Sequence, residues 1–230
     1  VYGESDFGIA VDMDDLAAND YALHPDRYRE PSVVFENGGA FGSVMQSISR
    51  GAPCMAKDLD RMSSHEKTDL RFLLMNDIRD GIMNEPETSL AFIDDKFAKY
   101  QVRDGDLIIS KNGYPYKIAV ATVRDGLKVI ASGNLYVIRV DSEKADPYYL
   151  KAFFESEQGR RSLDRISVGT VLKNIGVDSL KKLEIPLPPV EIQRKFAEEY
   201  RRGQEHICRL QEELELRKKE LAGMYDKFPL

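Results

Sequence analysis

The sequence predicts an α+β fold, in which a mixed, largely antiparallel sheet is followed by one long C-terminal helix of the coiled-coil type. Segments rich in β-branched residues alternate with glycine turns in the middle of the chain, and helical patterns gather after them. An uninterrupted helical pattern then runs from residue 189 to about 226. We therefore divide the chain into an acidic segment at 1–30, a globular domain at 31–186 and a long helix at 187–230.

The composition is typical of an ordinary globular protein and leaves room for a local basic surface. A chain of 230 residues with 42% hydrophobic residues can form one sizeable core plus an appendage. Residues 1–99 hold 10 Lys and Arg against 19 Asp and Glu, whereas residues 100–185 hold 14 against 11. The overall acidity therefore does not exclude a nucleic-acid partner. Cys54 and Cys208 give no disulfide framework and favour a reduced, cytoplasmic setting.

The first third of the chain shows few long periodic patterns. Asp12–Ala18 has the composition of a short helix. The glycines of 37–43 indicate a flexible turn before a helix, because their spacing fits neither a dinucleotide-binding nor a P-loop signature. Residues 44–49 fit either a short helix or a strand. We expect a polar loop at 53–67 and a strand at 70–75, followed by a turn into another strand.

Four strands are expected in the middle of the domain. Lys111-Asn112-Gly113 predicts a hairpin turn, since Asn-Gly readily adopts left-handed conformations. Further glycine turns at Asp125-Gly126 and Ser132-Gly133 separate the later strands. The expected strands are 107–110, 117–124, 128–131 and 134–140.

Helices follow this sheet. Asp146 is a favourable N-cap and Pro147 a favourable first helical residue, so a helix is expected from there to about Ser156. A second helix is expected from Arg160. A final strand at 183–185 then leads into a proline-rich hinge.

The C-terminal helix carries an apolar stripe. Pro189 suits its first turn, and 189–226 would extend roughly 57 Å. Apolar residues recur at steps of three, four or seven, with an interruption at Arg217. The stripe predicts pairing with a second helix, and the alternative is that it packs on its own globular domain. Its members are Ile192, Phe196, Tyr200, Gly203, Ile207, Leu210, Leu214, Leu221 and Met224.

The order of several short motifs resembles that of a known family. The motifs are Gly105-Asp106-Leu107-Ile108-Ile109-Ser110, Ser132-Gly133-Asn134-Leu135-Tyr136, Asp146-Pro147-Tyr148-Tyr149-Leu150, Gly169-Thr170 and Ile185-Pro186-Leu187-Pro188-Pro189-Val190-Glu191-Ile192-Gln193. Over roughly 40–230 they resemble the target-recognition domain and conserved long helix of type I restriction-modification specificity subunits. In addition, Asn19 to Tyr28 resembles the C-terminal tail of the N6-adenine DNA methyltransferases of these systems, as if the chain came from a fused protein.

The resemblance implies a non-catalytic module that selects a double-stranded DNA sequence and directs an N6-adenine methyltransferase to it. No cofactor or metal is then expected on this chain, because S-adenosylmethionine would belong to the partner. Specificity subunits of this family usually carry two recognition domains and two long helices that pair with each other. This chain has one of each, which favours homodimerisation or docking on the methyltransferase through 187–230.

Three polar sets in the domain are candidates for contacting DNA. DNA reading needs hydrogen-bonding groups at base edges and cations at phosphates, and the alternative for each set is an ordinary solvated surface. The first set is Lys111, Asn112, Tyr114, Tyr116 and Lys117. The second is Lys57, Arg61 and Ser63, with Ser64, His65 and Lys67 nearby. The third is Arg160, Arg161, Lys173 and Asn174, with Arg165 and Thr170 nearby.

Enzymatic alternatives find little support in the residues. Asp146-Pro147-Tyr148-Tyr149 superficially resembles the catalytic motif of amino-methyltransferases, but it lacks the second proline and a helix cap explains it better. The histidines show no metal-binding spacing. Asp106 and Lys111 only weakly resemble a nuclease pair. The remaining alternative is a protein-interaction module that uses the long helix and does not bind DNA.

Overall fold

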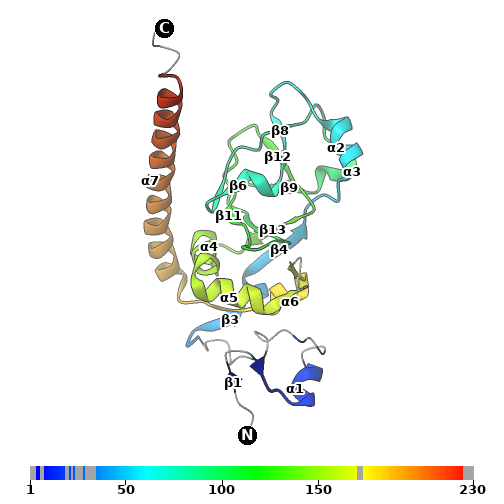
Figure 1. The fold of residues 1–230 in the computed structure, drawn as a ribbon, viewed down its shortest axis with the longest axis vertical. Helices are drawn as coiled ribbons and strands as arrows, with labels where there is room; N and C mark the ends of the chain where they lie inside the picture. The colour runs from blue at the N-terminus through cyan, green and yellow to red at the C-terminus, as the bar shows by residue number, and fades with distance from the viewer. Residues whose placement is uncertain are drawn as a thin grey trace.

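Two four-stranded sheets pack against each other at the centre of the globular domain, and helices cover the outer face of each (Figure 1). This computed structural model describes residues 4–5, 8–18, 21, 23, 28, 35–169 and 173–224. Sheets and a long C-terminal helix within one chain confirm the predicted α+β class.

The first sheet is antiparallel throughout, in the order β11-β10-β13-β4. Its register is regular except for a shift between Arg139 and Val140, where β13 pairs with β4. The strands are β4 (Met45–Arg50), β10 (Leu107–Ser110), β11 (Ile118–Val120) and β13 (Leu135–Val140).

The second sheet is mixed, in the order β8-β5-β12-β9. Its central pair, β5 and β12, is parallel, and the two outer strands are antiparallel to their neighbours. The strands are β5 (Leu70–Leu73), β8 (Thr88–Ser89), β9 (Gln101–Val102) and β12 (Lys128–Ala131). The expectation of a mixed, largely antiparallel arrangement is therefore correct.

Strands β10, β11, β12 and β13 are buried on both faces, which explains why they are almost continuously apolar. Successive side chains of a strand point to opposite faces. Leu107 and Ile109 accordingly join the core under the later helices, whereas Ile108 joins the core between the sheets. On β12, Val129 faces the inter-sheet core and Ile130 faces a third core. The domain is thus built of four layers, with helices outermost.

Short helices supply the outer layers. In Figure 1, α4, α5 and α6 lie below the first sheet, and α2 and α3 lie at the far end of the second. The helices are α1 (Met13–Ala18), α2 (Ala56–Met62), α3 (Asp95–Ala98), α4 (Pro147–Glu155), α5 (Glu157–Ile166) and α6 (Val177–Lys182), with 3-10 turns η2 (Phe41–Val44) and η3 (Met75–Asp77). Two-stranded ladders join β1 (Glu4–Ser5) to β2 (Gly8–Ile9), β3 (Gly38–Ala40) to β16 (Glu184–Pro186), β6 (Ile78–Arg79) to β7 (Ile82–Met83), and β14 (Ser167–Val168) to β15 (Asn174–Ile175).

Several local predictions need correction. The polar loop expected at 53–67 contains α2, whose Met62 is buried in the third core. The hairpin turn expected at 111–113 is the start of a longer connection that Ser110 N–H and Lys117 C=O close at 2.8 Å. The helix expected from Arg160 begins three residues earlier, because Ser156 Oγ caps it by accepting from Gly159 N–H. Most of the 19–28 motif and Thr170 lie outside the described residues.

The long helix α7 spans Val190–Ala222, and its 33 residues correspond to about 50 Å. Pro189 is its N-cap and not, as expected, its first helical residue. Gln193 and Ala197 are buried against the domain, whereas the stripe leucines are about half exposed. The alternative in which the stripe packs on its own domain is therefore wrong for most of its members. Tyr200 and Phe196 do contact the domain: the Tyr200 hydroxyl bonds to Lys151 of α4, and the Phe196 ring, although 46% exposed, lies edge-on to Tyr149.

A buried glutamine joins the start of α7 to the N-terminus of α4. The Gln193 side chain is fully buried; its Oε1 accepts from Asp146 N–H at 3.2 Å, and its Nε2 donates to Lys144 C=O and Pro188 C=O at 3.3 and 2.7 Å. Asp146 in turn caps α4 by accepting from Tyr148 N–H at 2.8 Å. One buried amide thus pairs three partly buried backbone groups, which accounts for a glutamine after the proline hinge.

We expect Gln193→Leu to lower the free energy of unfolding by about 3 kcal/mol. Leucine fills a similar volume but leaves these backbone groups unpaired, and each buried unpaired group costs about 1–3 kcal/mol. Urea denaturation followed by circular dichroism measures the change. Glu212→Leu, at a solvent-exposed position of the same helix, is the matched control and should change stability by less than about 0.5 kcal/mol. Equal stabilities of the two variants would contradict the role given to Gln193.

Candidate nucleic-acid interface

Two of the three predicted sets meet at one end of the first sheet. Gly113 N–H donates to Lys173 C=O at 3.1 Å, and Ile175 N–H donates to Lys111 C=O at 3.1 Å. Asn112 and Asn174 form an antiparallel bridge. The β10–β11 connection and the segment at 173–175, which are sixty residues apart in sequence, therefore form one surface.

The turn at 132–134 continues this surface. Lys111 N–H donates to Asn134 C=O at 2.7 Å, and the Asn112 amide donates to Asn134 Oδ1 at 3.4 Å. On its other side the turn pairs with 52–53 through the Ala52–Ser132 bridge, and α2 begins a few residues later. We call residues 111–114, 132–134, 173–174 and 52–57 the loop ridge.

The cations of the predicted sets divide into paired and unpaired ones. Among the described residues, Lys57, Lys111, Lys117 and Arg160 have no carboxylate within ion-pair distance. By contrast, Arg61 bonds to Asp94 at 2.6 Å, Arg161 to Glu157 at 2.5 Å and Lys173 to Asp164 at 3.0 Å. An unpaired cation attracts a phosphate without first losing a partner. Lys57, Lys111, Lys117 and Arg160 are therefore the members of the predicted sets whose charge no described carboxylate neutralises.

An exposed tyrosine stands on the ridge above a buried ion pair. The Tyr114 side chain is 66% exposed, and Lys173 Nζ lies 4.6 Å from its ring centroid. Lys173 is itself held by Asp164, a residue of α5 that is largely buried. A cation against an aromatic ring restrains it. Lys173 therefore supports Tyr114 and is less suited to hold a phosphate.

Three residues of the predicted sets make contacts inside the domain. The Tyr116 ring packs against the first core, and burial raises the pKa of its phenol. Ser63 Oγ donates to Leu59 C=O at 2.7 Å at the end of α2. Arg61 stacks over Phe92 while bonded to Asp94. These contacts place them less favourably for DNA than their neighbours on the ridge.

Sequence reasoning did not select Asn134 as a candidate. Its side chain is exposed beside Asn112, and the preceding turn is anchored because Arg50 Nε donates to Gly133 C=O at 2.7 Å. The sequence indicated Ser132-Gly133-Asn134 as a turn and as part of a family-like motif, but not as a DNA contact. Its proximity to Asn112 depends on β10 pairing with β13, a contact that the sequence alone does not specify.

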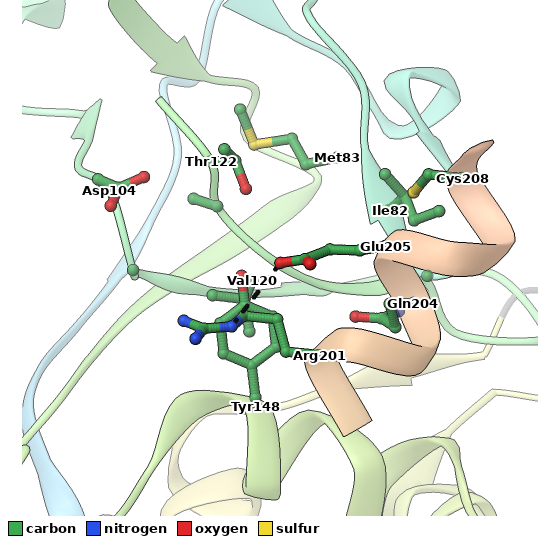
Figure 2. Close-up of a pocket in the computed structure, with 13 residues that line it drawn as sticks. Ile82, Met83, Asp104, Val120, Thr122, Tyr148, Arg201, Gln204, Glu205 and Cys208 are labelled. Atoms are coloured by element: carbon green, nitrogen blue, oxygen red, sulfur yellow. Dashed lines mark ion pairs between the residues drawn. The ribbon is translucent and has the colours of Figure 1, made fainter. Parts of the chain in front are cut away.

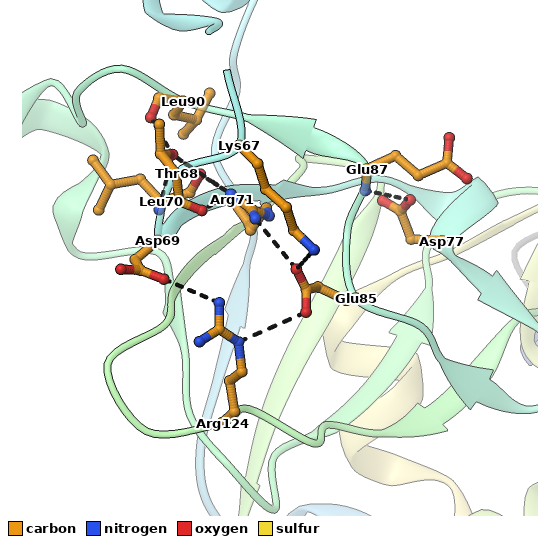
Figure 3. A network of polar contacts seen from close by, with 10 residues as sticks. All are labelled: Lys67, Thr68, Asp69, Leu70, Arg71, Asp77, Glu85, Glu87, Leu90 and Arg124. Carbon is orange, nitrogen blue, oxygen red and sulfur yellow. Dashed lines mark hydrogen bonds and ion pairs between the residues drawn. The ribbon is translucent and has the colours of Figure 1, made fainter. Parts of the chain in front are cut away.

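A network of charged residues lies at the opposite end of the second sheet (Figure 3). The fully buried Arg71 donates to Glu85, which also pairs with Lys67 and Arg124. Hydrogen bonds from Lys67 and Arg71 lower the pKa of Glu85. Because Leu70 and Lys128 pair at this end and Leu73 and Ala131 at the ridge end, the network is remote from the ridge. Lys67 is therefore a structural cation.

The acidic residues considered for catalysis are likewise structural. The buried Asp106 carboxylate accepts from Arg139 Nε and Nη2 at 3.0 and 3.2 Å and from Arg103 N–H at 2.8 Å. Asp146 is the expected helix cap. Among the described residues, no group of three or more His, Cys, Asp or Glu side chains could hold a metal ion. Within the same residues, no helix is long and apolar enough to cross a membrane.

An open cavity of about 410 Å³, lined by both polar and apolar residues, separates α7 from the edge of the sheets (Figure 2). Arg201 and Glu205 of α7 form an ion pair of 3.9 Å over it, and the Arg201 guanidinium lies 6.0 Å from the Tyr148 ring. Thr122 and Asp104 line the domain side. The cavity lies on the α7 side of the domain and shares no residue with the loop ridge.

Comparison with known proteins finds relatives that all come from type I restriction-modification systems. A family model described as the type I restriction modification DNA specificity domain matches residues 64–199. The putative type I restriction enzyme MjaX specificity subunit of Methanocaldococcus jannaschii is 26% identical over 147 residues, covering 61% of this chain and 35% of that protein.

Solved structures share the fold at low sequence identity. A chain from a study of complex assembly and conformational transition of the type I R-M system gives a TM-score of 0.54 at 20% identity, covering 90% of this chain and 48% of that one. The type I restriction-modification S subunit from M. genitalium gives 0.53 at 14% identity, covering 82% and 46%. The HsdS subunit from Thermoanaerobacter tengcongensis gives 0.53 at 17% identity, covering 86% and 47%.

The chain spans about half the length of these solved chains and about a third of the curated relative. The family model nevertheless covers more than half of this chain, from the start of the second sheet through the first turns of α7. The chain therefore belongs to the type I restriction modification DNA specificity domain family.

Proposed function

We propose that this chain is a non-catalytic module that recognises a short double-stranded DNA sequence and directs an N6-adenine methyltransferase of a restriction-modification system to it. The observation that carries the proposal is the loop ridge, which offers unpaired lysines and the exposed Asn134 amide on a rigid sheet in a chain of the DNA specificity domain family. The chemistry and the S-adenosylmethionine belong to the methyltransferase in this proposal. The setting is the cytoplasm.

The ridge supplies both kinds of group that DNA recognition requires. Lys111 and Lys57 of the ridge, together with Lys117 at the end of the same β10–β11 connection, are suited to phosphates, which position a protein on the duplex without reading its sequence. Asn134 presents an exposed amide, which can form hydrogen bonds to a base edge in the major groove, and the partly buried Asn112 supports it by donating to its Oδ1. Tyr114 adds an exposed ring for apolar contact with bases.

The exposed stripe of α7 supports an assembly role. Ile192, Phe196, Ile207, Leu210, Leu214 and Leu221 are each between 46% and 67% exposed. A helix that leaves a continuous apolar stripe in water gains by pairing with another. We propose that a second copy of this chain covers the stripe, forming a homodimer that brings two recognition domains together. Docking of the methyltransferase on the same stripe is the competing outcome.

Selection from a random duplex pool tests the recognition proposal directly. The full chain is incubated with the pool at moderate salt, with and without the methyltransferase, and bound DNA is sequenced. We expect enrichment of one short motif in at least one condition. Recovery of no motif in either condition would overturn the proposal in favour of a protein-interaction module.

Removing an unpaired lysine should weaken DNA binding in a salt-dependent manner. We expect Lys111→Gln and Lys117→Gln each to reduce the slope of log K against log salt by about 1, since each releases one phosphate contact. Fluorescence anisotropy with the selected duplex at several salt concentrations measures the slope. Lys128→Gln is the matched control, because it removes an exposed lysine at the opposite end of the second sheet. Equal slopes in all three variants would remove the β10–β11 connection from the interface.

Charging the stripe should prevent self-association. We expect the double variant Leu210→Asp/Leu214→Asp to run as a monomer in sedimentation velocity at concentrations where the parent chain is dimeric, because two carboxylates would be desolvated in the paired state. Leu216→Asp is the matched control: it is also an exposed leucine of α7, at 57%, but it lies off the stripe. A dimer that survives the double substitution would refute pairing through this stripe.

A further inference from the structure

A lysine is buried where α7 crosses α4. The Lys151 side chain is 1% exposed, although lysine is rarely buried this completely. Its Nζ bonds to Glu155 Oε2 at 2.8 Å and to Tyr200 Oη at 2.7 Å, and Tyr200 also donates to Glu155. The ammonium lies 4.8 Å from the Tyr200 ring centroid. Lys151, Glu155 and Tyr200 form a polar triad between two helices.

The β6–β7 turn closes over this triad from the side of the sheets. Asp80 and Gly81 both have positive φ, at 51° and 74°, as a tight hairpin turn requires. A Cβ at Gly81 would overlap the Glu155 carboxylate and lie 2.9 Å from Lys151 Nζ. Only glycine therefore lets the turn approach the triad so closely, and three separate elements converge on it.

The same turn touches α7 a second time. Gln211 Nε2 donates to Asp80 Oδ2 at 3.1 Å. Gln211 is eleven residues beyond Tyr200, about 16 Å further along the helix axis. Between the two contacts lies the cavity of Figure 2, where α7 stands away from the sheets. The helix is thus held at two separated points, and two points define its direction.

Stability alone does not account for the buried Lys151 ammonium at this crossing, whose partner Glu155 is 26% exposed. Taking a charge out of water is costly, and well-packed apolar residues of similar size often give equal or greater stability. A polar network differs from an apolar contact in direction, because its hydrogen bonds are satisfied in only one arrangement of the helices. An apolar crossing tolerates small rotations that this triad does not.

We infer that Lys151, Glu155 and Tyr200 are positioning residues that fix the direction of α7 relative to the recognition domain. Gly81 and the Asp80–Gln211 contact complete this arrangement. The consequence for DNA spacing rests on the proposed function, since the direction of α7 sets where a paired helix holds its own domain relative to the loop ridge. The fixed direction is itself a property of the free chain.

Distance distributions between two spin labels test this inference without DNA. Labels are attached at Lys128→Cys in the domain and Glu213→Cys on α7, in a full chain carrying Cys54→Ala and Cys208→Ala. Both label sites are exposed, and Glu213 lies on the side of α7 away from Gln211. Dilution with unlabelled chain leaves only distances within one molecule.

We expect a single narrow distance distribution for the parent chain. The triple variant Lys151→Met/Glu155→Leu/Tyr200→Phe should at least double the width of that distribution. Its circular dichroism spectrum and the sharpness of its thermal unfolding should stay unchanged, which shows that it still folds. Tyr200→Phe alone is the second variant, since it keeps the ring and the Lys151–Glu155 pair; we expect a smaller but measurable broadening. Glu198→Gln/Arg202→Met removes an exposed ion pair of α7 and is the matched control, with no broadening.

Unchanged widths in both triad variants would overturn the inference and leave the triad a packing feature. Should the triple variant not fold, the Tyr200→Phe result decides. Failure of the DNA selection would leave these distances untouched, so the two proposals fail separately.

Discussion

Burial of both faces of β10, β11 and β13 in the first sheet is the constraint on which the rest of the domain depends. Each of these three strands contacts the helical layer on one side and the second sheet on the other, so a slip of one residue would move its side chains from one core into the other. The register of β10 with its neighbours is therefore tightly specified. Loops that leave this sheet inherit that rigidity, and the ridge formed by 111–114 and 132–134 is held by backbone hydrogen bonds at its base.

Charge pairing then separates structural from available cations. The domain contains many lysines and arginines, but a large share are bonded to carboxylates, as Arg71 and Lys67 are to Glu85. Cations without such partners gather in part on the ridge, where Lys111 is an example. The overall acidity of the chain is consequently a poor guide to what this surface attracts, because attraction is decided by local unpaired charge.

The long helix presents two adjacent faces with different tasks. One face is bound to the domain through buried polar groups, Gln193 at its start and Tyr200 two turns later. The neighbouring face is apolar and exposed, as Leu210 and Leu214 illustrate. Directional hydrogen bonds suit the fixed contact, whereas non-directional apolar area suits association with another molecule. Separation of the two chemistries lets the helix be rigidly attached and still free to pair.

The sequence by itself determined the α+β class, the four central strands, the capped helix at Asp146 and the extent of the long helix, because these depend on local periodicity, capping and turn chemistry. Only the tertiary structure decided that 53–67 contains α2 and that Asn134 lies beside Asn112. It also decided that the Tyr200 side chain faces the domain and bonds to Lys151. Those outcomes depend on which strands pair and which helix face meets the domain, and such contacts join residues far apart in the chain.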